Sequence, residues 1–329
     1  MLRKILLMLA AFALVAFATS RAQADDAPAP IKVKVGTLAP KNSPWGGVFT
    51  VWQKGLSQRT GGKLEIEFFW NGTGGDEPGM AAKLRNGQLD GAAMTATGLS
   101  QFSKSILALQ LPGWAGGDWS RVDRAREGLK PTLDAEFASQ KMLLAGTGDV
   151  GLARLMSIGA PVKNPSDLKG MSPFHLPGDP IGKTFLTKLG VPLQTVSVPE
   201  ILPKLGGSIK ALNTPALAAE QLQWSGKITH VNSMVTGAGV GGLVFAVDKL
   251  NALPADLKDA LLETGKVAGQ ALTGRIRRED AAAYDRLTKK VEVYNPTAED
   301  TAAWQTIFGQ VRSELCGSTI KAEACAFAK

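Results

Sequence analysis

The chain has 329 residues, with 37 Lys and Arg against 29 Asp and Glu, and a formal net charge of +8. This length suits two domains or one large two-lobed body with ample core. No run of more than two basic residues is interleaved with aromatic residues, so we expect no nucleic-acid partner. The two His and two Cys lack metal-ligand spacing, so we expect neither a metal site nor a cofactor.

The first 24 residues have the order of a secretory signal peptide. Two basic residues, Arg3 and Lys4, precede an apolar block at residues 5–18, and a stretch of small residues ends at Ala24. We expect cleavage after Ala24, because the apolar block is short for a membrane span. Cleavage leaves 305 residues, with 34 basic and 29 acidic, in an exported protein. An uncleaved membrane anchor is the alternative.

The N-terminal third of the mature chain alternates strand and helix. Ile and Val alternate with Lys at the start, which is the period of a strand with one buried face. The expected elements are a strand at 31–35, a helix at 43–60, a strand at 64–70, a helix at 76–86 and a strand at 91–95. This alternation predicts an α/β fold with ligand-binding loops at the C-terminal ends of the strands.

The rest of the chain repeats this pattern and then changes to one long helix. From Pro254 to Lys290 apolar residues keep roughly helical spacing. At about 1.5 Å per residue this helix is about 50 Å long, enough to cross more than one lobe. Before it we expect strands at 141–145 and 152–158, a capped turn at 164–170, a strand-like stretch at 171–176 and a helix at 181–189.

The residues that usually carry catalysis show no catalytic pattern. Neither His175 nor His230 accompanies a Gly-x-Ser-x-Gly nucleophile elbow. The Gly-rich stretch 72–75 lacks the endings of phosphate-binding loops, and we interpret it as a flexible turn. Asp76 and Glu77 are interpreted as acidic residues at the positive end of a helix. The chain therefore has the residues of a binding protein and not of an enzyme.

The two cysteines lie near the C-terminus, at Cys316 and Cys325. In an oxidising compartment they are expected to form one disulfide that holds the tail.

Several segments in a fixed order resemble extracytoplasmic solute-binding proteins of tripartite ATP-independent periplasmic transporters. Together they cover most of the mature chain. The matching segments lie at 36–40, 43–45, 59–64, 84–91, 109–112, 165–170 and 253–257.

The resemblance implies an α/β fold of the two-lobed periplasmic-binding-protein clamp type, with mixed sheets, hinge crossovers and the long helix spanning both lobes. Lobe I is expected to contain residues 25–148 and about 238–262. Lobe II is expected to contain residues 149–237 and about 263–329. The ligand would lie in the cleft, and the closed form would dock on integral membrane permease subunits driven by an ion gradient.

Two positions depart from the family pattern. Where members usually carry an Arg that binds a ligand carboxylate in two parallel hydrogen bonds, this chain has Phe174 or, with one inserted residue, His175. A segment that usually presents amides to the ligand has Leu212, Asn213 and Thr214 here. The cleft has therefore lost hydrogen-bonding capacity, and the resemblance places several large apolar side chains beside it.

One basic residue, Arg154, lies in a strand whose family counterpart reaches the ligand carboxylate in some members. It is either an anchor of this kind or an Arg whose stem packs on the sheet. The tryptophans likewise are candidates for either ligand contact or core. The candidate ligand-binding residues are Trp45, Trp70, Asn71, Met94, Thr95, Trp114, Arg154, Phe174, His175, Leu212, Asn213 and Thr214.

The sequence therefore predicts a periplasmic protein that captures a small apolar or amphipathic solute and delivers it to the permease. One alternative is capture of a carboxylate ligand by Arg154 as a non-standard anchor. Others are a binding module for a sensor or an ATP-driven transporter, and an exported enzyme on the same fold. The resemblance also implies a periplasmic helical-repeat protein as an additional partner, because members without the usual Arg are associated with one.

Overall fold

The computed structural model of the chain describes residues 29–328, so the predicted signal peptide lies outside the described part. One mixed sheet of seven strands runs through this part in the order β2-β1-β3-β6-β4-β5, with β7 beside β6. Its strands are β1 (Ile31–Thr37), β2 (Leu64–Phe69), β3 (Gly91–Thr95), β4 (Met142–Ser157), β5 (Ala211–Pro215), β6 (His230–Ala246) and β7 (Glu292–Tyr294).

Helices pack on both faces of the sheet. Successive residues of a strand point to opposite faces, so one strand can contribute apolar side chains to both layers. In β3, Ala92 and Met94 belong to one hydrophobic cluster, and Ala93 packs against the other. The helices are α2 (Pro44–Arg59), α3 (Glu77–Arg85), α4 (Ala96–Leu99), α5 (Trp119–Ser139), α6 (Pro180–Leu189), α7 (Val198–Lys204), α8 (Ala216–Gln221), α9 (Val247–Asn251), α10 (Ala255–Thr288), α11 (Ala298–Leu315) and α12 (Ala322–Cys325), with 3-10 helices at Lys104–Gln110 and Pro165–Gly170.

The N-terminal alternation predicted from the sequence is confirmed, with the strands β1, β2 and β3 in parallel pairs. The Ser43 hydroxyl accepts a hydrogen bond from the backbone N–H of Gly46 and begins α2. The Asp76 carboxylate does the same for α3 through the N–H of Gly79. After α2 the chain turns at Gly61, whose φ of 58° is in the left-handed region that favours glycine.

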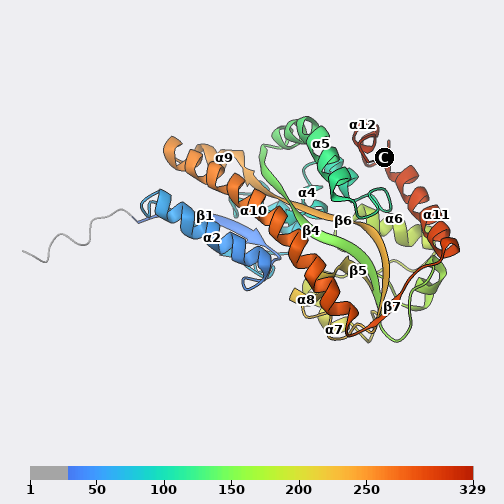
Figure 1. Cartoon of the computed structure of the whole chain (residues 1–329). Helices are drawn as coiled ribbons and strands as arrows, with labels where there is room; N and C mark the ends of the chain where they lie inside the picture. Colours follow the sequence, from blue (N-terminus) through green and yellow to red (C-terminus); the bar gives the residue numbers. More distant parts are fainter. Residues whose placement is uncertain (1–28, 329) are drawn as a thin grey trace, which may run out of the picture.

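The two longest strands, β4 and β6, pair antiparallel from Met142 opposite Ala246 to Ser157 opposite His230. At one end β6 also pairs with β3, and at the other end β4 pairs with β5. Figure 1 shows both strands curving through the molecule from one end to the other. Two neighbouring strands therefore connect the two halves of the fold, as expected for a clamp with hinge crossovers.

Three of the predicted strands are corrected by the structure. The separate strands expected at 141–145 and 152–158 are one continuous strand, β4. Its pairing with β6 is irregular between Leu144 and Gly146 and again between Asp149 and Gly151. These glycines and β-bulges interrupt the alternation of apolar and polar residues, so the sequence did not show that β4 is one strand. The stretch 171–176 is not a strand and makes a single bridge between His175 and Thr195, because Pro173 cannot donate to a ladder.

The predicted long helix is confirmed as α10, with 34 residues. It crosses the front of the molecule in Figure 1 and contacts α2, β4 and α8. Near its start the Thr264 hydroxyl accepts a hydrogen bond of 3.0 Å from the Trp52 indole of α2. Near its end the buried Asp280 carboxylate accepts hydrogen bonds from the backbone N–H groups of Leu152 in β4 and Leu217 in α8.

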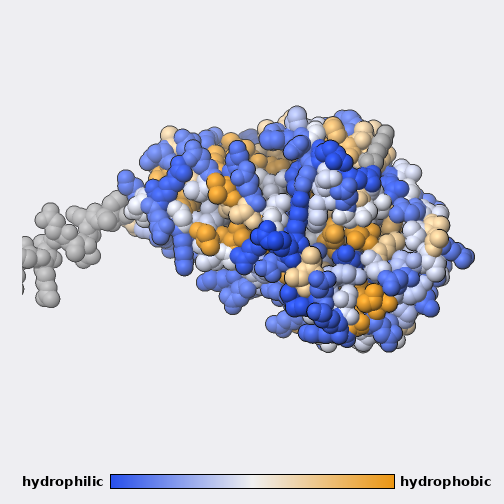
Figure 2. All heavy atoms as spheres, in the orientation of Figure 1, coloured by the Kyte–Doolittle hydropathy of each residue, from blue (hydrophilic) through white to orange (hydrophobic). Residues whose placement is uncertain are grey.

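The face of the molecule shown in Figure 2 is mostly hydrophilic, with hydrophobic residues gathered in a few separate places. Val51 on α2 and Val267 on α10 are among the large apolar residues that are exposed. Within residues 29–328, no helix is both long enough and apolar enough to span a membrane.

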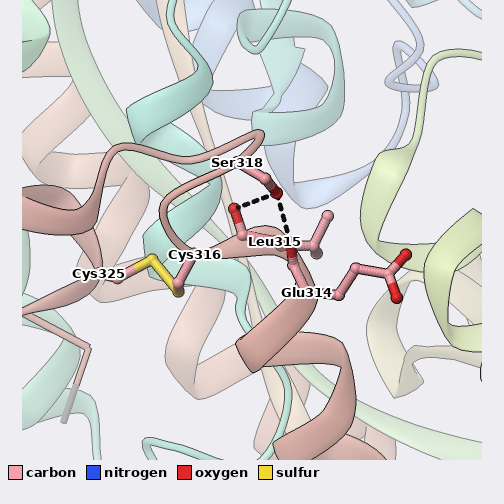
Figure 3. Close-up of a disulfide and its surroundings, with 5 residues drawn as sticks. All are labelled: Glu314, Leu315, Cys316, Ser318 and Cys325. Carbon is pink, nitrogen blue, oxygen red and sulfur yellow. Dashed lines mark hydrogen bonds between the residues drawn. A yellow bond between two sulfur atoms is a disulfide. The ribbon is translucent and has the colours of Figure 1, made fainter.

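The predicted disulfide between Cys316 and Cys325 is confirmed (Figure 3). It joins the end of α11 to α12 across the turn between them. The Ser318 hydroxyl donates to the backbone carbonyl groups of Glu314 and Leu315 in the same turn.

Replacing both Cys316 and Cys325 with Ser is expected to lower the free energy of unfolding by about 2 to 3 kcal/mol, because the cross-link closes a short loop in the unfolded chain. Urea unfolding of the variant and the unreduced parent would measure this difference. Thiol titration of the unfolded, unreduced parent should find no free thiol. Equal stability of the two proteins would show that the disulfide does not stabilise the tail.

Asp280→Ala is expected to destabilise the protein by about 2 to 5 kcal/mol, because one buried and one partly buried N–H group lose their acceptor. Asp285→Ala, an exposed position on the same helix, is the matched control and should change stability by less than about 0.5 kcal/mol. Denaturant unfolding measures both. Similar losses for the two variants would mean that Asp280 does not join α10 to β4 and α8.

Candidate functional site

A cavity of about 360 Å³ lies where β4 and β6 pass between the two halves of the fold. On one side it is lined by Glu77 at the start of α3 and by Ile181 of α6. On another it is lined by Trp52 of α2 and Leu272 of α10. Because these helices belong to different layers, the cavity reaches both faces of the sheet.

Five of the twelve residues predicted to bind ligand line this cavity, namely Trp45, Met94, Thr95, Asn213 and Thr214. The structure holds three of their polar groups in hydrogen bonds. The Thr95 hydroxyl donates to the Glu77 carboxylate at 2.7 Å. The Asn213 side-chain oxygen accepts from the Thr236 hydroxyl at 2.7 Å, and the Trp45 indole donates to the Asp149 carbonyl at 3.4 Å.

The other seven predicted residues lie outside the cavity lining. Trp70 stacks on Phe68 with ring centroids 4.6 Å apart. Leu212 is buried in the core, because it points to the opposite side of β5 from its neighbour Asn213. The remaining five are Asn71, which is exposed, Trp114, which is buried, and Phe174, His175 and Arg154, which are partly buried.

Phe174 and His175 follow the 3-10 helix at Pro165–Gly170, where the family pattern has its Arg. Phe174 packs against the hydrophobic core cluster that contains Leu212. The two ring nitrogens of His175 lie 2.9 Å from the Leu176 carbonyl oxygen and 3.2 Å from the Thr195 hydroxyl. Both side chains are therefore engaged with the protein around them.

Arg154 stacks on an aromatic ring of α10. Its guanidinium carbon lies 3.9 Å from the centre of the Tyr284 ring. Its Nε and a terminal N–H donate to the backbone carbonyls of Ser233 and Leu152, each at 3.4 Å. Burial lowers the pKa of this guanidinium. Within residues 29–328 no carboxylate oxygen lies within 4 Å of it, and this packing resembles the scaffold alternative more than the anchor.

The charged groups of the cavity lining are all acidic within the described part of the chain: Glu77, Asp149 and Asp179. Asp149 forms ion pairs with Arg126 and Arg277. Burial raises the pKa of Glu77 and of Asp179. No Lys, Arg or His of residues 29–328 lines the cavity, so this lining has hydrogen-bond acceptors and apolar surface but no cation.

Two kinds of lining residue were not recognised in the sequence. Glu77 was interpreted only as a helix-terminal acid, since nothing local shows that a carboxylate will be buried. The glycines of β6, at 237, 239, 241 and 242, also line the cavity. Their density within one strand was a usable signal, because glycine weakens strands and marks close approach of another group. Residues 29–328 contain no cluster of three or more possible metal ligands.

The two-lobed fold and its cavity at the crossing strands are those of a solute-binding clamp. A model of the bacterial extracellular solute-binding protein family 7 matches residues 35–316, and the chain belongs to this family. The resemblance to the solute-binding proteins of tripartite ATP-independent periplasmic transporters is thereby confirmed. The family consists of solute receptors and not of enzymes.

Solved structures of such receptors share the fold at low sequence identity. A protein from Roseobacter denitrificans with bound β-D-glucuronate has 17% identity and a TM-score of 0.80, with 91% of this chain and 98% of that chain covered. A Bordetella pertussis receptor binding pyroglutamic acid has 16% identity and a TM-score of 0.82, with 90% and 98% covered. A Shewanella oneidensis protein with bound succinate has 17% identity and a TM-score of 0.82, with 91% and 98% covered.

Arg154→Met is expected to lower the free energy of unfolding by about 0.5 to 2 kcal/mol through loss of the contact with Tyr284. Binding of the apolar fluorescent probe 1-N-phenylnaphthylamine should stay within about twofold, because the guanidinium does not line the cavity. Arg124→Met, at an exposed position, is the control. Tight binding of succinate by the parent that is lost in Arg154→Met, with an unchanged melting temperature, would instead identify Arg154 as a ligand anchor.

Proposed function

We propose that this protein captures a small apolar or amphipathic solute in the periplasm and delivers it to an ion-gradient-driven membrane permease. The proposed ligand class is inferred from the cavity of about 360 Å³. Its lining in residues 29–328 has three acidic residues and no basic one. Family membership supports solute capture and an extracytoplasmic location.

A carboxylate ligand would be poorly held in such a cavity. Moving an ionised carboxylate from water to an apolar site is costly unless a cation or several hydrogen-bond donors receive it. Here the ionised carboxylates of Glu77 and Asp179 would repel it, and no Lys, Arg or His of residues 29–328 lines the cavity to offset that charge. An apolar ligand gains about 25 cal/mol per Å² of surface removed from water, without needing a cation.

The carboxylate alternative requires Arg154 to leave Tyr284 and turn toward the cavity. The structure gives Arg154 a place in the packing between β4 and α10. We therefore favour the apolar ligand. Delivery to the permease, cleavage after Ala24 and the helical-repeat partner rest on the family resemblance. Closure is proposed to be a hinge motion of the two predicted lobes about the β4 and β6 crossing.

Calorimetry on protein that has been unfolded, stripped of ligand and refolded should show no binding tighter than about 1 mM for succinate, D-glucuronate or pyroglutamate. The same protein should bind 1-N-phenylnaphthylamine. Organic extraction of the protein as purified, followed by mass spectrometry, is expected to release an apolar molecule. Micromolar binding of a small hydrophilic acid would contradict the proposed ligand class.

A further inference from the structure

An unusual share of the cavity lining is glycine. Glycine in the interior of a helix or strand costs about 0.5 to 1 kcal/mol relative to Ala, so a cluster of them calls for a physical reason. The lining glycines come from three elements that meet at the crossing of the two halves. They are Gly146 and Gly148 of β4, Gly237, Gly239, Gly241 and Gly242 of β6, and Gly265 and Gly269 of α10.

Some of these glycines are required by the packing of the protein itself. A Cβ atom at Gly241 would lie 2.6 Å from the carbonyl oxygen of Met94. One at Gly242 would lie 2.7 Å from the carbonyl oxygen of Gly146. Backbone atoms cannot move aside cheaply, so the close approach of the strands explains glycine at these positions.

Three other glycines have no such explanation. A Cβ atom at Gly146 would meet nothing within 4 Å. At Gly237 the nearest atom would be 3.7 Å away, and at Gly269 it would be 3.8 Å away. None of the three has φ in the left-handed region. Their backbone conformation and their neighbours would accept a side chain, which would project into space that glycine leaves open.

These open positions follow the direction of the strands. Gly269 of α10 lies opposite the Thr147 carbonyl, next to Gly146 in β4. Gly237 pairs with Ala153 farther along the same two strands. From position 237 to position 242 the path along β6 is about 17 Å at about 3.4 Å per residue. The surrounding cavity side chains include Leu243 and Leu272, which give this part of the lining apolar surface.

We propose that the cavity-lining glycines at 146, 237 and 269 determine ligand specificity by leaving room for the aliphatic chain of the solute between β4, β6 and α10. This inference rests on the proposed function, since it assigns the apolar part of the ligand to one part of the same cavity. Ladder pairing between β4 and β6 occupies backbone polar groups along both strands, apart from irregularities such as those between Leu144 and Gly146 and between Ala153 and Arg154. A saturated chain needs no hydrogen bonds of its own and can lie along the paired segments.

The test uses 1-octanol, 1-dodecanol and 1-hexadecanol, measured by displacement of 1-N-phenylnaphthylamine from the full mature protein. The unsubstituted protein should bind the longer alkanols more tightly, because each added CH₂ group buries more apolar surface. Gly269→Leu should weaken dodecanol and hexadecanol by about tenfold or more and leave octanol within about twofold. Gly55→Leu is the matched control, a helix glycine with open space at its Cβ that lies outside the cavity.

Gly146→Val places a side chain in the same space from β4. If Gly269→Leu does not fold, this second variant still tests the inference. Melting temperatures establish that each variant is folded. Unchanged chain-length dependence in both folded variants would overturn the inference and leave the proposed function in place. If the unsubstituted protein bound no alkanol and no apolar probe, the proposed function would be wrong and the inference would fall with it.

Discussion

The antiparallel pairing of β4 with β6 is the interaction on which the two halves of this protein depend. Both strands are about three times the usual strand length of five to six residues. At one end they extend the parallel sheet that contains β3, and at the other they hold β5 and β7. Any movement of one half relative to the other must therefore bend this pair, and its bulges and glycines make bending possible there.

The long helix α10 limits how that pair can move. Asp280 holds the backbone of β4 beside Gly151 and the start of α8, and Trp52 donates to Thr264 near the other end. The Arg277 side chain adds ion pairs to Asp149 and Asp123. These contacts are buried or partly buried and directional, so they fix the helix over the crossing strands. The cavity is thus bounded by the fixed helix α10 on one side and by the irregularly paired strands β4 and β6 on the other.

The charges around the cavity follow from the same arrangement. Arg277 and Arg126 are used to neutralise Asp149, and Arg154 is stacked on Tyr284. The basic residues near the crossing are therefore engaged in holding the fold. Since an engaged guanidinium offers little to a ligand, the described lining presents apolar surface and three acidic side chains but no basic partner for a carboxylate. This is the physical ground for proposing a ligand class different from the carboxylates bound in the compared structures.

Local signals in the sequence determined much of the fold. Capping residues such as Ser43 and Asp76 define where helices begin, and helical spacing after Pro254 defines α10. The order of the family segments and the cysteine pair were also readable, because each depends on neighbours in the chain. Only the tertiary structure decided which side chains reach the cavity. Burial of Glu77 and stacking of Arg154 on Tyr284 depend on residues far apart in sequence, and alternation along a strand turns adjacent residues to opposite faces.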